Sequence, residues 1–135
     1  GKEELDACFA IRQNIFVGEQ KLFEETDRDE HDHQAVHIGA FLNDRIIGTV
    51  RVYKDRSGIW WGGRLAVLKR FRGRAGRLLV QKATETVRAQ KAHCFRAHVQ
   101  AENINFFKSL GWTPVGDVAD HHGRPHQLME APLIP

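Results

Sequence analysis

Apolar and polar residues alternate along this chain with two different periods, and each period indicates a different secondary structure. Over residues 3–17 apolar side chains recur three and four positions apart, which predicts an amphipathic helix. Residues 18–33 show no apolar period, so we expect a loop or a short irregular helix there. Residues 35–41 and 45–53 are rich in Val and Ile and flank Asn43-Asp44, which predicts a β-hairpin.

The remainder of the chain combines further strands with two helices. Residues 59–67 predict a third strand, and Gly62-Gly63 within it indicates a bulge or a close backbone approach. A turn rich in Gly and Arg at 70–76 precedes a helix at 77–90. The later elements follow in chain order: a strand at 94–100, a helix at 101–110 that Gly111 ends, and strands at 112–118 and 127–131.

This order of elements predicts one mixed α/β domain. The helix between the third and fourth strands is a crossover, so these two strands should run parallel. We therefore expect a mostly antiparallel central sheet with helices on both faces and a central parallel strand pair. The 135 residues suit a single domain with one core. Because the chain begins at Gly1 without a methionine and stops just after its last strand, we expect a fragment of a longer chain.

Composition narrows the class of protein. Hydrophobic residues make up 41% and charged residues 27%, which is typical of a globular domain, and no apolar run approaches the ~20 residues that span a bilayer. Cys8 and Cys94 have neither disulfide-scaffold nor zinc spacing, so we expect a reduced, cytoplasmic protein. The net charge is only +3, with one basic cluster at 69–77, which favours a small polyanionic ligand over a nucleic acid.

The junction between the third strand and the next helix carries the clearest candidate chemistry. A helix N-terminus has unpaired N–H groups and about half a positive charge, and small residues let a phosphate approach that backbone. Arginines add charge-assisted donors. The small residues are Gly73, Ala75 and Gly76, and the arginines are Arg70, Arg72, Arg74 and Arg77. An ordinary turn with a solvated surface is the alternative, and neither the Walker nor the dinucleotide-binding pattern is matched.

The six residues from Arg70 to Ala75 resemble the Arg/Gln-x-x-Gly-x-Gly/Ala signature of the GNAT acyltransferase superfamily. Residues 103–112, Asn-Ile-Asn-Phe-Phe-Lys-Ser-Leu-Gly-Trp, are similar to the late motif of the same superfamily. Further likeness at 16–20, 48–51 and 125–129 extends the resemblance to nearly the whole chain. The combination resembles the ElaA-like branch, and resembles still more the GNAT domain found N-terminal to AIR-synthase-like domains.

This resemblance implies an N-acyltransferase that uses acetyl-CoA. The pyrophosphate would lie on the signature segment and Arg77, and the pantetheine arm along Leu65, Ala66 and Val67. Asn103 and Phe106 of the late motif would also bind the cofactor. The acetyl group would pass by direct attack to a primary amine of a small molecule or peptide. The alternative is a non-catalytic acyl-CoA-binding module of a larger enzyme.

The chain departs from the superfamily pattern at two points. It opens on a helix where the superfamily opens on a strand, which leaves a sheet edge exposed and predicts a homodimer, or instability without the residues upstream. The resemblance to the domain found N-terminal to AIR-synthase-like domains implies a fused C-terminal domain. Phe107 occupies the position where the superfamily commonly has a tyrosine that protonates the leaving thiolate, and Tyr53 is the only tyrosine. Because a thiol has a pKa of about 8.5, we expect slow transfer without a dedicated acid.

Two residues are the candidate general bases. Glu19 follows the first helix, where acceptors commonly approach in the superfamily, and His126 lies where the resembling families also have a histidine. A solvated loop acid and a structural histidine are the alternatives. His37, His98 and Cys94 are weaker candidates, since packed or buried side chains explain them equally well.

The remaining polar and aromatic clusters have simpler interpretations. Residues 27–33 alternate Asp and His but lack the EF-hand and HExxH spacings, so we expect no metal. We interpret this stretch as an acidic rim that faces an amine acceptor, with a solvated loop as the alternative. Core packing is expected instead of nucleic-acid stacking for the aromatic residues Trp60, Trp61, Phe106, Phe107 and Trp112.

Overall fold

The computed structural model describes residues 1–21, 28–121 and 123–133. The helical segments are α1 (Lys2–Arg12), the π-helix η1 (Gln13–Glu19), the 3₁₀ turn η2 (Lys69–Phe71), α2 (Arg72–Ala89), the 3₁₀ turn η3 (Ala101–Asn103) and α3 (Ile104–Ser109). The strands are β1 (Val36–Leu42), β2 (Arg45–Lys54), β3 (Trp60–Val67), β4 (Phe95–Gln100), β5 (Thr113–Pro114), β6 (Ala119–His121) and β7 (Arg124–Glu130). Within the described ranges, no helix is both long and apolar enough to cross a membrane.

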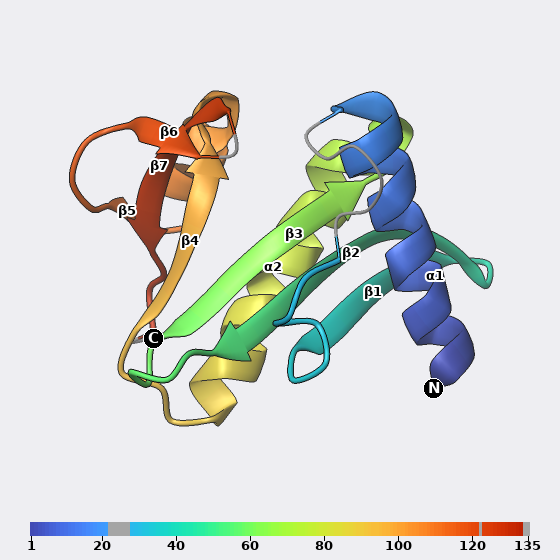
Figure 1. The fold of residues 1–135 in the computed structure, drawn as a ribbon, viewed down its shortest axis with the longest axis horizontal. Coiled ribbons are helices and arrows are strands. Elements are labelled where there is room, and N and C mark those ends of the chain that lie inside the picture. The colour runs from blue at the N-terminus through green and yellow to red at the C-terminus, as the bar shows by residue number, and fades with distance from the viewer. Residues whose placement is uncertain (22–27, 122, 134–135) are drawn as a thin grey trace.

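The seven described strands form one sheet in the order β1-β2-β3-β4-β7-β5, and β6 pairs with β7. All neighbouring strands are antiparallel except β3 and β4, which run parallel, so the predicted mixed sheet with its central parallel pair is confirmed. β3 and β4 pair only at three positions, Trp60–Gly62 opposite Phe95–Ala97. Beyond these positions the two strands diverge (Figure 1).

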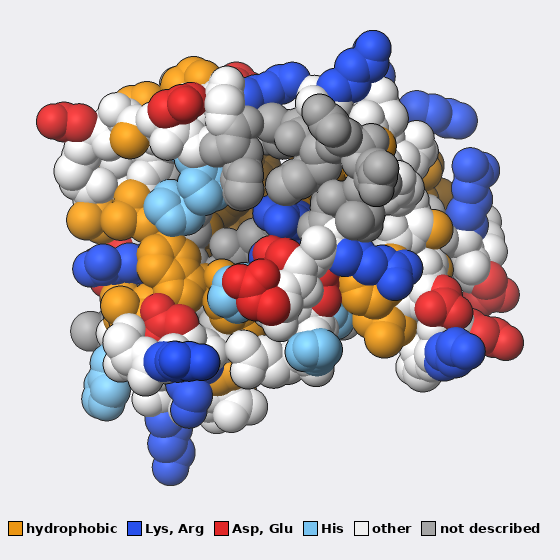
Figure 2. Space-filling view, in the orientation of Figure 1, with side chains coloured by type: hydrophobic (Ala, Val, Ile, Leu, Met, Phe, Trp, Pro, Cys, Tyr) orange, Lys and Arg blue, Asp and Glu red, His pale blue; other side chains and the backbone are white. Residues whose placement is uncertain are grey.

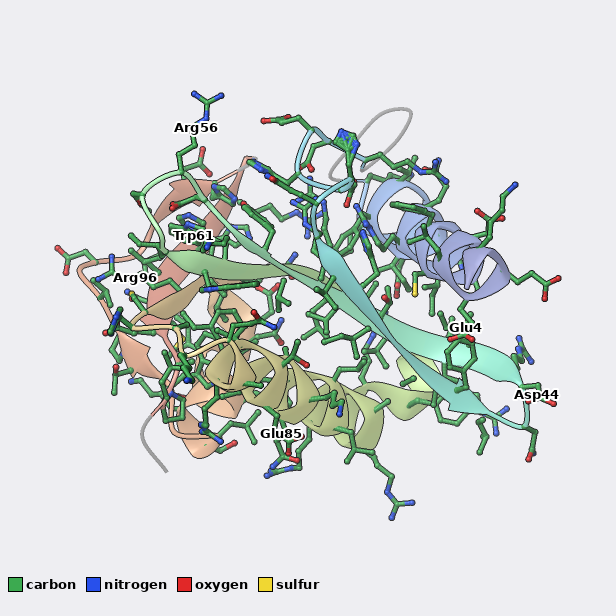
Figure 3. The ribbon with its side chains drawn as sticks, turned by 90° about the horizontal axis from the view of Figure 1, so that it is seen from below. Glu4, Asp44, Arg56, Trp61, Glu85 and Arg96 are labelled. Carbon is green, nitrogen blue, oxygen red and sulfur yellow. The ribbon has the colours of Figure 1, made fainter. Side chains whose placement is uncertain are left out.

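Helices cover both faces of the sheet, as predicted. On one face, Leu79, Ala83 and Val87 of α2 pack with buried residues of the central strands and with Phe107 of α3. On the other face, Ile11 of α1 and two η1 residues pack on Ala66 of β3. Figure 3 shows the sheet between α1 and α2. Figure 1 shows α1 crossing β1, β2 and β3, while no described helix lies over β4, β6 and β7 on that face.

Local signals in the sequence predicted two backbone features. The hairpin between β1 and β2 turns at Asn43 and Asp44, which have φ of 51° and 67°, the left-handed pair that a type I′ turn requires. β3 carries a bulge opposite the Thr49–Arg51 step of β2, with Arg64 at φ 49°. The close approach lies at Gly62, where an added Cβ would come within 2.9 Å of the Phe95 ring.

The predicted boundaries were wrong in the glycine-rich segment and near the C-terminus. α2 begins at Arg72, five residues earlier than expected, so Gly73 to Gly76 belong to a helix and not to a turn. The strand expected at 112–118 is only Thr113–Pro114, because Pro114 has no N–H to extend the ladder and Gly116 turns the chain with φ 71°. β6 was missed, and it forms a hairpin with β7.

The N-terminal part of the described fold differs less from expectation. The first helix continues two residues beyond the predicted Val17 because the backbone widens into the π-helix η1, which ends at Glu19. β1, the first strand of the described chain, forms one edge of the sheet. The homodimer expected at an open edge and the fused C-terminal domain stay predictions.

Candidate functional site

The end of η1 lies against the junction between β3 and α2. Arg72, the first residue of α2, pairs through its Nη2 with the Oε2 atom of Glu19. The same guanidinium donates from Nε to the carbonyl oxygen of Val67, the last residue of β3, at 3.1 Å. One arginine therefore joins the candidate base Glu19 to the segment expected to hold phosphate, a contact between residues far apart that the sequence did not reveal.

The next residue, Gln20, spans the gap between the diverging strands. Its side-chain Oε1 accepts a hydrogen bond from Nε2 of Gln100, the last residue of β4, at 2.8 Å. Its carbonyl oxygen accepts one from Nη2 of Arg124, the first residue of β7. The end of η1 therefore contacts the carboxyl ends of both β3 and β4, which places Glu19 and Gln20 at the point where the parallel pair separates.

The N-terminus of α2 keeps the features expected of an anion site, although it is a helix from Arg72 onward. Gly73 is exposed, and a Cβ added there would meet nothing within 4 Å. The 18-residue helix has no acidic residue in its first turn, so its unpaired N–H groups and dipole favour an anion. The side chains of Arg70, Arg74 and Arg77 are exposed around it.

The other small residues of this segment serve a different purpose. Ala75 and Gly76 are buried and face the sheet, and a Cβ on Gly76 would come within 3.7 Å of Cζ of Phe106 in α3. Phe106 therefore packs on the first turns of α2, next to the candidate anion site. Asn103 is exposed at the start of α3.

The β3 residues expected along the pantetheine arm lie beyond the paired part of β3. Ala66 and Val67 are buried, and Leu65 packs against the main core. β4 pairs with β3 only up to Gly62, so the edge of β3 that faces β4 has no described strand partner beyond that residue. An extended amide-bearing chain fits such an edge because it can use the unpaired backbone groups.

His126 is held in one orientation. His126 is only 7% exposed, and its Nδ1 lies 2.9 Å from the carbonyl oxygen of Arg124. Because a carbonyl oxygen only accepts, Nδ1 carries the proton and donates, which leaves Nε2 of the neutral ring as the acceptor. In the sheet His126 is opposite Gln100, the same residue that contacts Gln20. Gln20, the chain neighbour of Glu19, is thus linked through Gln100 to the strand position of His126.

Phe107, at the position of the usual tyrosine acid, is packed inside the protein. It is buried in the core, with its ring edge-to-face against Trp112 at 5.1 Å and against Phe106 at 5.7 Å. The prediction of core packing is confirmed for Trp60, Phe106, Phe107 and Trp112, whereas half-buried Trp61 stacks on His98 outside the core.

The acidic rim predicted at 27–33 is wrong for Asp29 and Asp32, and Asp27 lies outside the described residues. Asp32 accepts two hydrogen bonds from Arg12 at 2.9 and 3.1 Å, and Arg51 donates to both carboxylates. Arg64, beside the bulge of β3, pairs with Asp29 at 3.2 Å. The two carboxylates therefore fix the 28–35 segment to α1 and the sheet instead of attracting an amine.

This ionic network also perturbs both acids. Burial alone would raise the pKa of Asp32, but hydrogen bonds from Arg12, from the Asp29 backbone and from Arg51 outweigh it and hold the pKa far below its usual value. The pKa of Asp29 is likewise lowered, because hydrogen bonding and charge from Arg51 outweigh burial. In the described ranges, no group of three or more His, Cys, Asp or Glu side chains is arranged to hold a metal ion.

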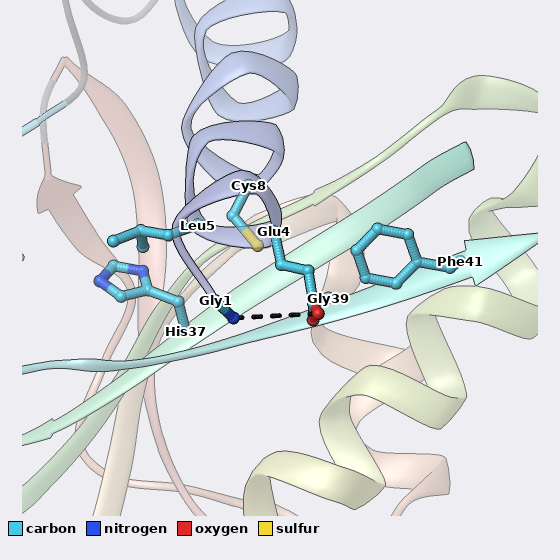
Figure 4. A pocket seen from close by; sticks show the side chains of 7 residues that line it. All are labelled: Gly1, Glu4, Leu5, Cys8, His37, Gly39 and Phe41. Atoms are coloured by element: carbon cyan, nitrogen blue, oxygen red, sulfur yellow. Dashed lines mark ion pairs between the residues drawn. The ribbon is translucent and has the colours of Figure 1, made fainter. Parts of the chain in front are cut away.

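The weaker candidates for a catalytic base or nucleophile are each engaged in other contacts. His37 donates from Nε2 to the carbonyl oxygen of Asp32 at 2.9 Å and lines a small pocket of about 190 Å³ between α1 and β1, shown in Figure 4. Cys94 donates from Sγ to the carboxylate of Glu130. Burial and, to a smaller extent, this carboxylate raise the pKa of the thiol, which disfavours a nucleophilic thiolate. His98 stacks between Trp61 and His121.

Comparison with known proteins supplies the family context. The family model for "Acetyltransferase (GNAT) family" matches residues 3–112. The uncharacterized N-acetyltransferase YjcF of Bacillus subtilis is 28% identical over 112 residues, which cover 82% of this chain and 79% of the relative. Protein ElaA of Escherichia coli is 29% identical over 144 residues, which cover 97% of this chain and 89% of ElaA.

Solved structures agree with this result. The crystal structure of Escherichia coli ElaA matches with a TM-score of 0.86 at 28% identity, covering 98% of this chain and 92% of that one. An acyl-CoA N-acyltransferase from Pseudomonas aeruginosa matches with a TM-score of 0.79 at 21% identity, covering 98% and 92% of the two chains, and supports the fold alone.

Proposed function

The chain belongs to the GNAT acetyltransferase family, in its ElaA-like branch, and on this premise we propose that it transfers an acetyl group from acetyl-CoA to a primary amine by direct attack. The acceptor is an amine of a small molecule or a peptide. The observation that carries the proposal is the strand-to-helix junction, where the family signature coincides with the open N-terminus of α2. Residues 1–135 would form one cytoplasmic acyltransferase domain that works without a metal.

The donor would bind along β3 and over the start of α2. Backbone N–H groups of the first helical turn, with Arg70, Arg74 and Arg77 around them, suit a pyrophosphate. The edge of β3 beyond Gly62 suits the amides of the pantetheine arm. Bound in this way, acetyl-CoA supplies an activated thioester carbonyl near the point where β3 and β4 diverge.

The residues of the chain then have to remove a proton from the acceptor, because an ammonium group cannot attack. We assign this step to Nε2 of His126, since the hydrogen bond from Nδ1 to the carbonyl oxygen of Arg124 leaves Nε2 of the neutral ring as the atom that can accept a proton. Glu19 is the second base, and it depends on Arg72, with which it pairs. A backbone N–H of β3 near the bulge supplies the donor for the tetrahedral oxyanion.

One observation favours a second function. Phe107 stands in place of the usual tyrosine acid, and a phenylalanine ring packed in the core has no proton to give to a leaving thiolate. A domain that binds acyl-CoA without transferring the acyl group, and that regulates a larger enzyme, would tolerate this replacement.

A thiol-release assay with acetyl-CoA and a broad panel of primary amines separates the two functions. The transferase releases CoA in the presence of at least one amine, and His126→Gln lowers that rate by about 10²-fold or more near neutral pH. The matched control is His93→Gln, an exposed histidine in the turn before β4. Binding of acetyl-CoA without release across the panel would favour the regulatory module, and absence of binding would contradict both.

A further inference from the structure

Four aromatic rings from four strands form a continuous row across the sheet. Trp61 of β3 stacks on His98 of β4, with ring centroids 5.2 Å apart and planes 8° from parallel. His98 stacks in turn on His121 of β6, at 4.2 Å and 17°. His121 meets the ring of His126 in β7 edge-to-face at 5.1 Å. The row therefore ends at the residue assigned as the general base.

The row lies on the face of the sheet that α1 covers in part, beside that helix. Phe95, Ala97 and Val99 of β4 face α2, so the alternating residue His98 points to the opposite face. His98 is exposed, and Trp61 is half-buried. Figure 1 shows no described helix over β4, β6 and β7 on this face, and Figure 2 shows histidine side chains at its surface next to hydrophobic ones.

The far end of the row is held rigidly. Nε1 of Trp61 donates to Oδ2 of Asp55 at 2.8 Å, which fixes the plane of the indole. The hydrogen bond from Trp61, with those from Ser57 and Ile59, lowers the pKa of Asp55 to about 2, so this carboxylate stays charged at neutral pH. Figure 3 shows Trp61 at the same end of the sheet as Arg96. A preorganised aromatic surface loses little conformational entropy when it binds a ligand.

We propose that this row of rings is the acceptor-binding surface and that the acceptor is an arylalkylamine, with its aromatic ring on Trp61 and His98 and its amine at Nε2 of His126. The inference rests on the proposed function and names its substrate class. Stacked and edge-to-face ring contacts favour an aromatic partner beyond the area they bury.

The side chains around the row decide between an aromatic and a polycationic acceptor. The four rings carry no carboxylate, and Asp55 beside Trp61 already accepts hydrogen bonds from Trp61, Ser57 and Ile59. A further aromatic ring, by contrast, can add to the stacked and edge-to-face contacts that the row already makes. The row therefore favours a ring over a second ammonium group.

The test compares amines that share an ethylamine chain. We expect 2-phenylethylamine and tyramine to have a lower KM than 2-cyclohexylethylamine or a diamine. Trp61→Ala and His98→Ala should each raise the KM for the aromatic amines by about three- to tenfold with kcat little changed. His93→Ala, an exposed histidine outside the row, is the matched control and should leave KM unchanged. A lower KM for the diamine, or equal effects of all three variants, would overturn the inference.

Direct binding keeps this test separate from the proposed reaction. Calorimetric titration of 2-phenylethylamine into the wild type and into the folded Trp61→Ala variant should show several-fold weaker binding to the variant. Ring-dependent binding without acetyl transfer would refute the proposed reaction and support the binding surface. Transfer to amines with no dependence on Trp61 or His98 would support the reaction and refute the surface.

Discussion

Glu19 and Arg72 are 53 residues apart in the sequence, and they form an ion pair that joins the last residue of η1 to the first residue of α2. Both side chains are about 40% exposed, so an incoming ligand can reach them. A phosphate at the start of α2 would compete with the Glu19 carboxylate for the same guanidinium, and the carboxylate would repel it. The pair thus connects the proposed donor site with the second candidate base.

Removing the carboxylate should therefore strengthen donor binding. We expect Glu19→Gln to tighten the binding of CoA by up to about fivefold, the range of an exposed ion pair, and the gain should shrink at high salt. Isothermal titration calorimetry at two salt concentrations measures both effects. Glu85→Gln, which removes an exposed carboxylate farther along α2, is the control and should change little. Unchanged or weaker binding by Glu19→Gln would argue against a phosphate near Arg72.

Gly73 offers a test of the donor position that leaves the fold intact. Apart from its chain neighbours and its own helix backbone, no atom lies within 4 Å of a Cβ built on Gly73, so there is open space for a larger side chain. The same side chain would stand in front of the first-turn N–H groups and exclude a phosphate. We expect Gly73→Val to weaken CoA binding by about tenfold or more with little change in melting temperature. The control is Gln81→Val, the same new side chain at an exposed position of α2, and equal affinity in both variants would refute the placement.

The sequence predicted those features that neighbouring residues determine. Asn43-Asp44 gave the correct hairpin because both residues tolerate the left-handed backbone that the turn needs. Gly73 and Gly76 were misread as a turn, because glycine is unfavourable in a helix and a local pattern does not show that Gly76 is buried next to Phe106. The family resemblance predicted the topology, which short-range patterns alone do not determine.

The site depended on contacts that no local pattern contains. The pairing of Glu19 with Arg72 and the ring row from Trp61 to His126 exist because the sheet brings distant segments together. Asp29 and Asp32 looked like a solvated acidic segment, because their arginine partners come from α1, β2 and β3. Charge composition shows that such residues exist but not which ones meet.

The buried ionic network predicts a dependence of stability on pH. The pKa of Asp32 is lower in the folded chain than its ordinary value of 3.8, so its contribution to stability is present above about pH 4 and is lost as the pH falls below that value. Asp32→Asn should lower the free energy of unfolding at pH 7 by about 3–5 kcal/mol, because the buried Arg12 then loses the negative charge of Asp32.

Urea unfolding at pH 7, 5 and 3 measures this difference. The gap between wild type and Asp32→Asn should be wide at pH 7 and 5 and narrower at pH 3, because there the unfolded wild type takes up a proton on Asp32 that the folded chain does not, which lowers its stability. Asp44→Asn, an exposed change at the tip of the β1–β2 hairpin, is the control and should follow the wild type at every pH. A gap of constant size from pH 7 to pH 3 would contradict the assignment.

The last prediction concerns the missing tyrosine acid at Phe107. If transfer is limited by protonation of the leaving thiolate, Phe107→Tyr should raise kcat, with ~10²-fold as the scale of one acid–base group. Wild-type transfer should rise with pH and show no descending limb near pH 10, because Tyr53, the only tyrosine, stacks on His31 away from Phe107 and its pKa is raised by burial. The variant should gain that limb.

Stability and a matched variant separate this effect from a change in packing. A hydroxyl placed in the core without a partner costs about 1–3 kcal/mol, so thermal unfolding of each variant has to accompany the kinetics. Phe95→Tyr places the same hydroxyl near the same Trp112 ring, at a position that no acid occupies in the proposed mechanism. It should lose stability without any gain in kcat. Fast wild-type turnover that Phe107→Tyr leaves unchanged would mean that another residue protonates the thiolate.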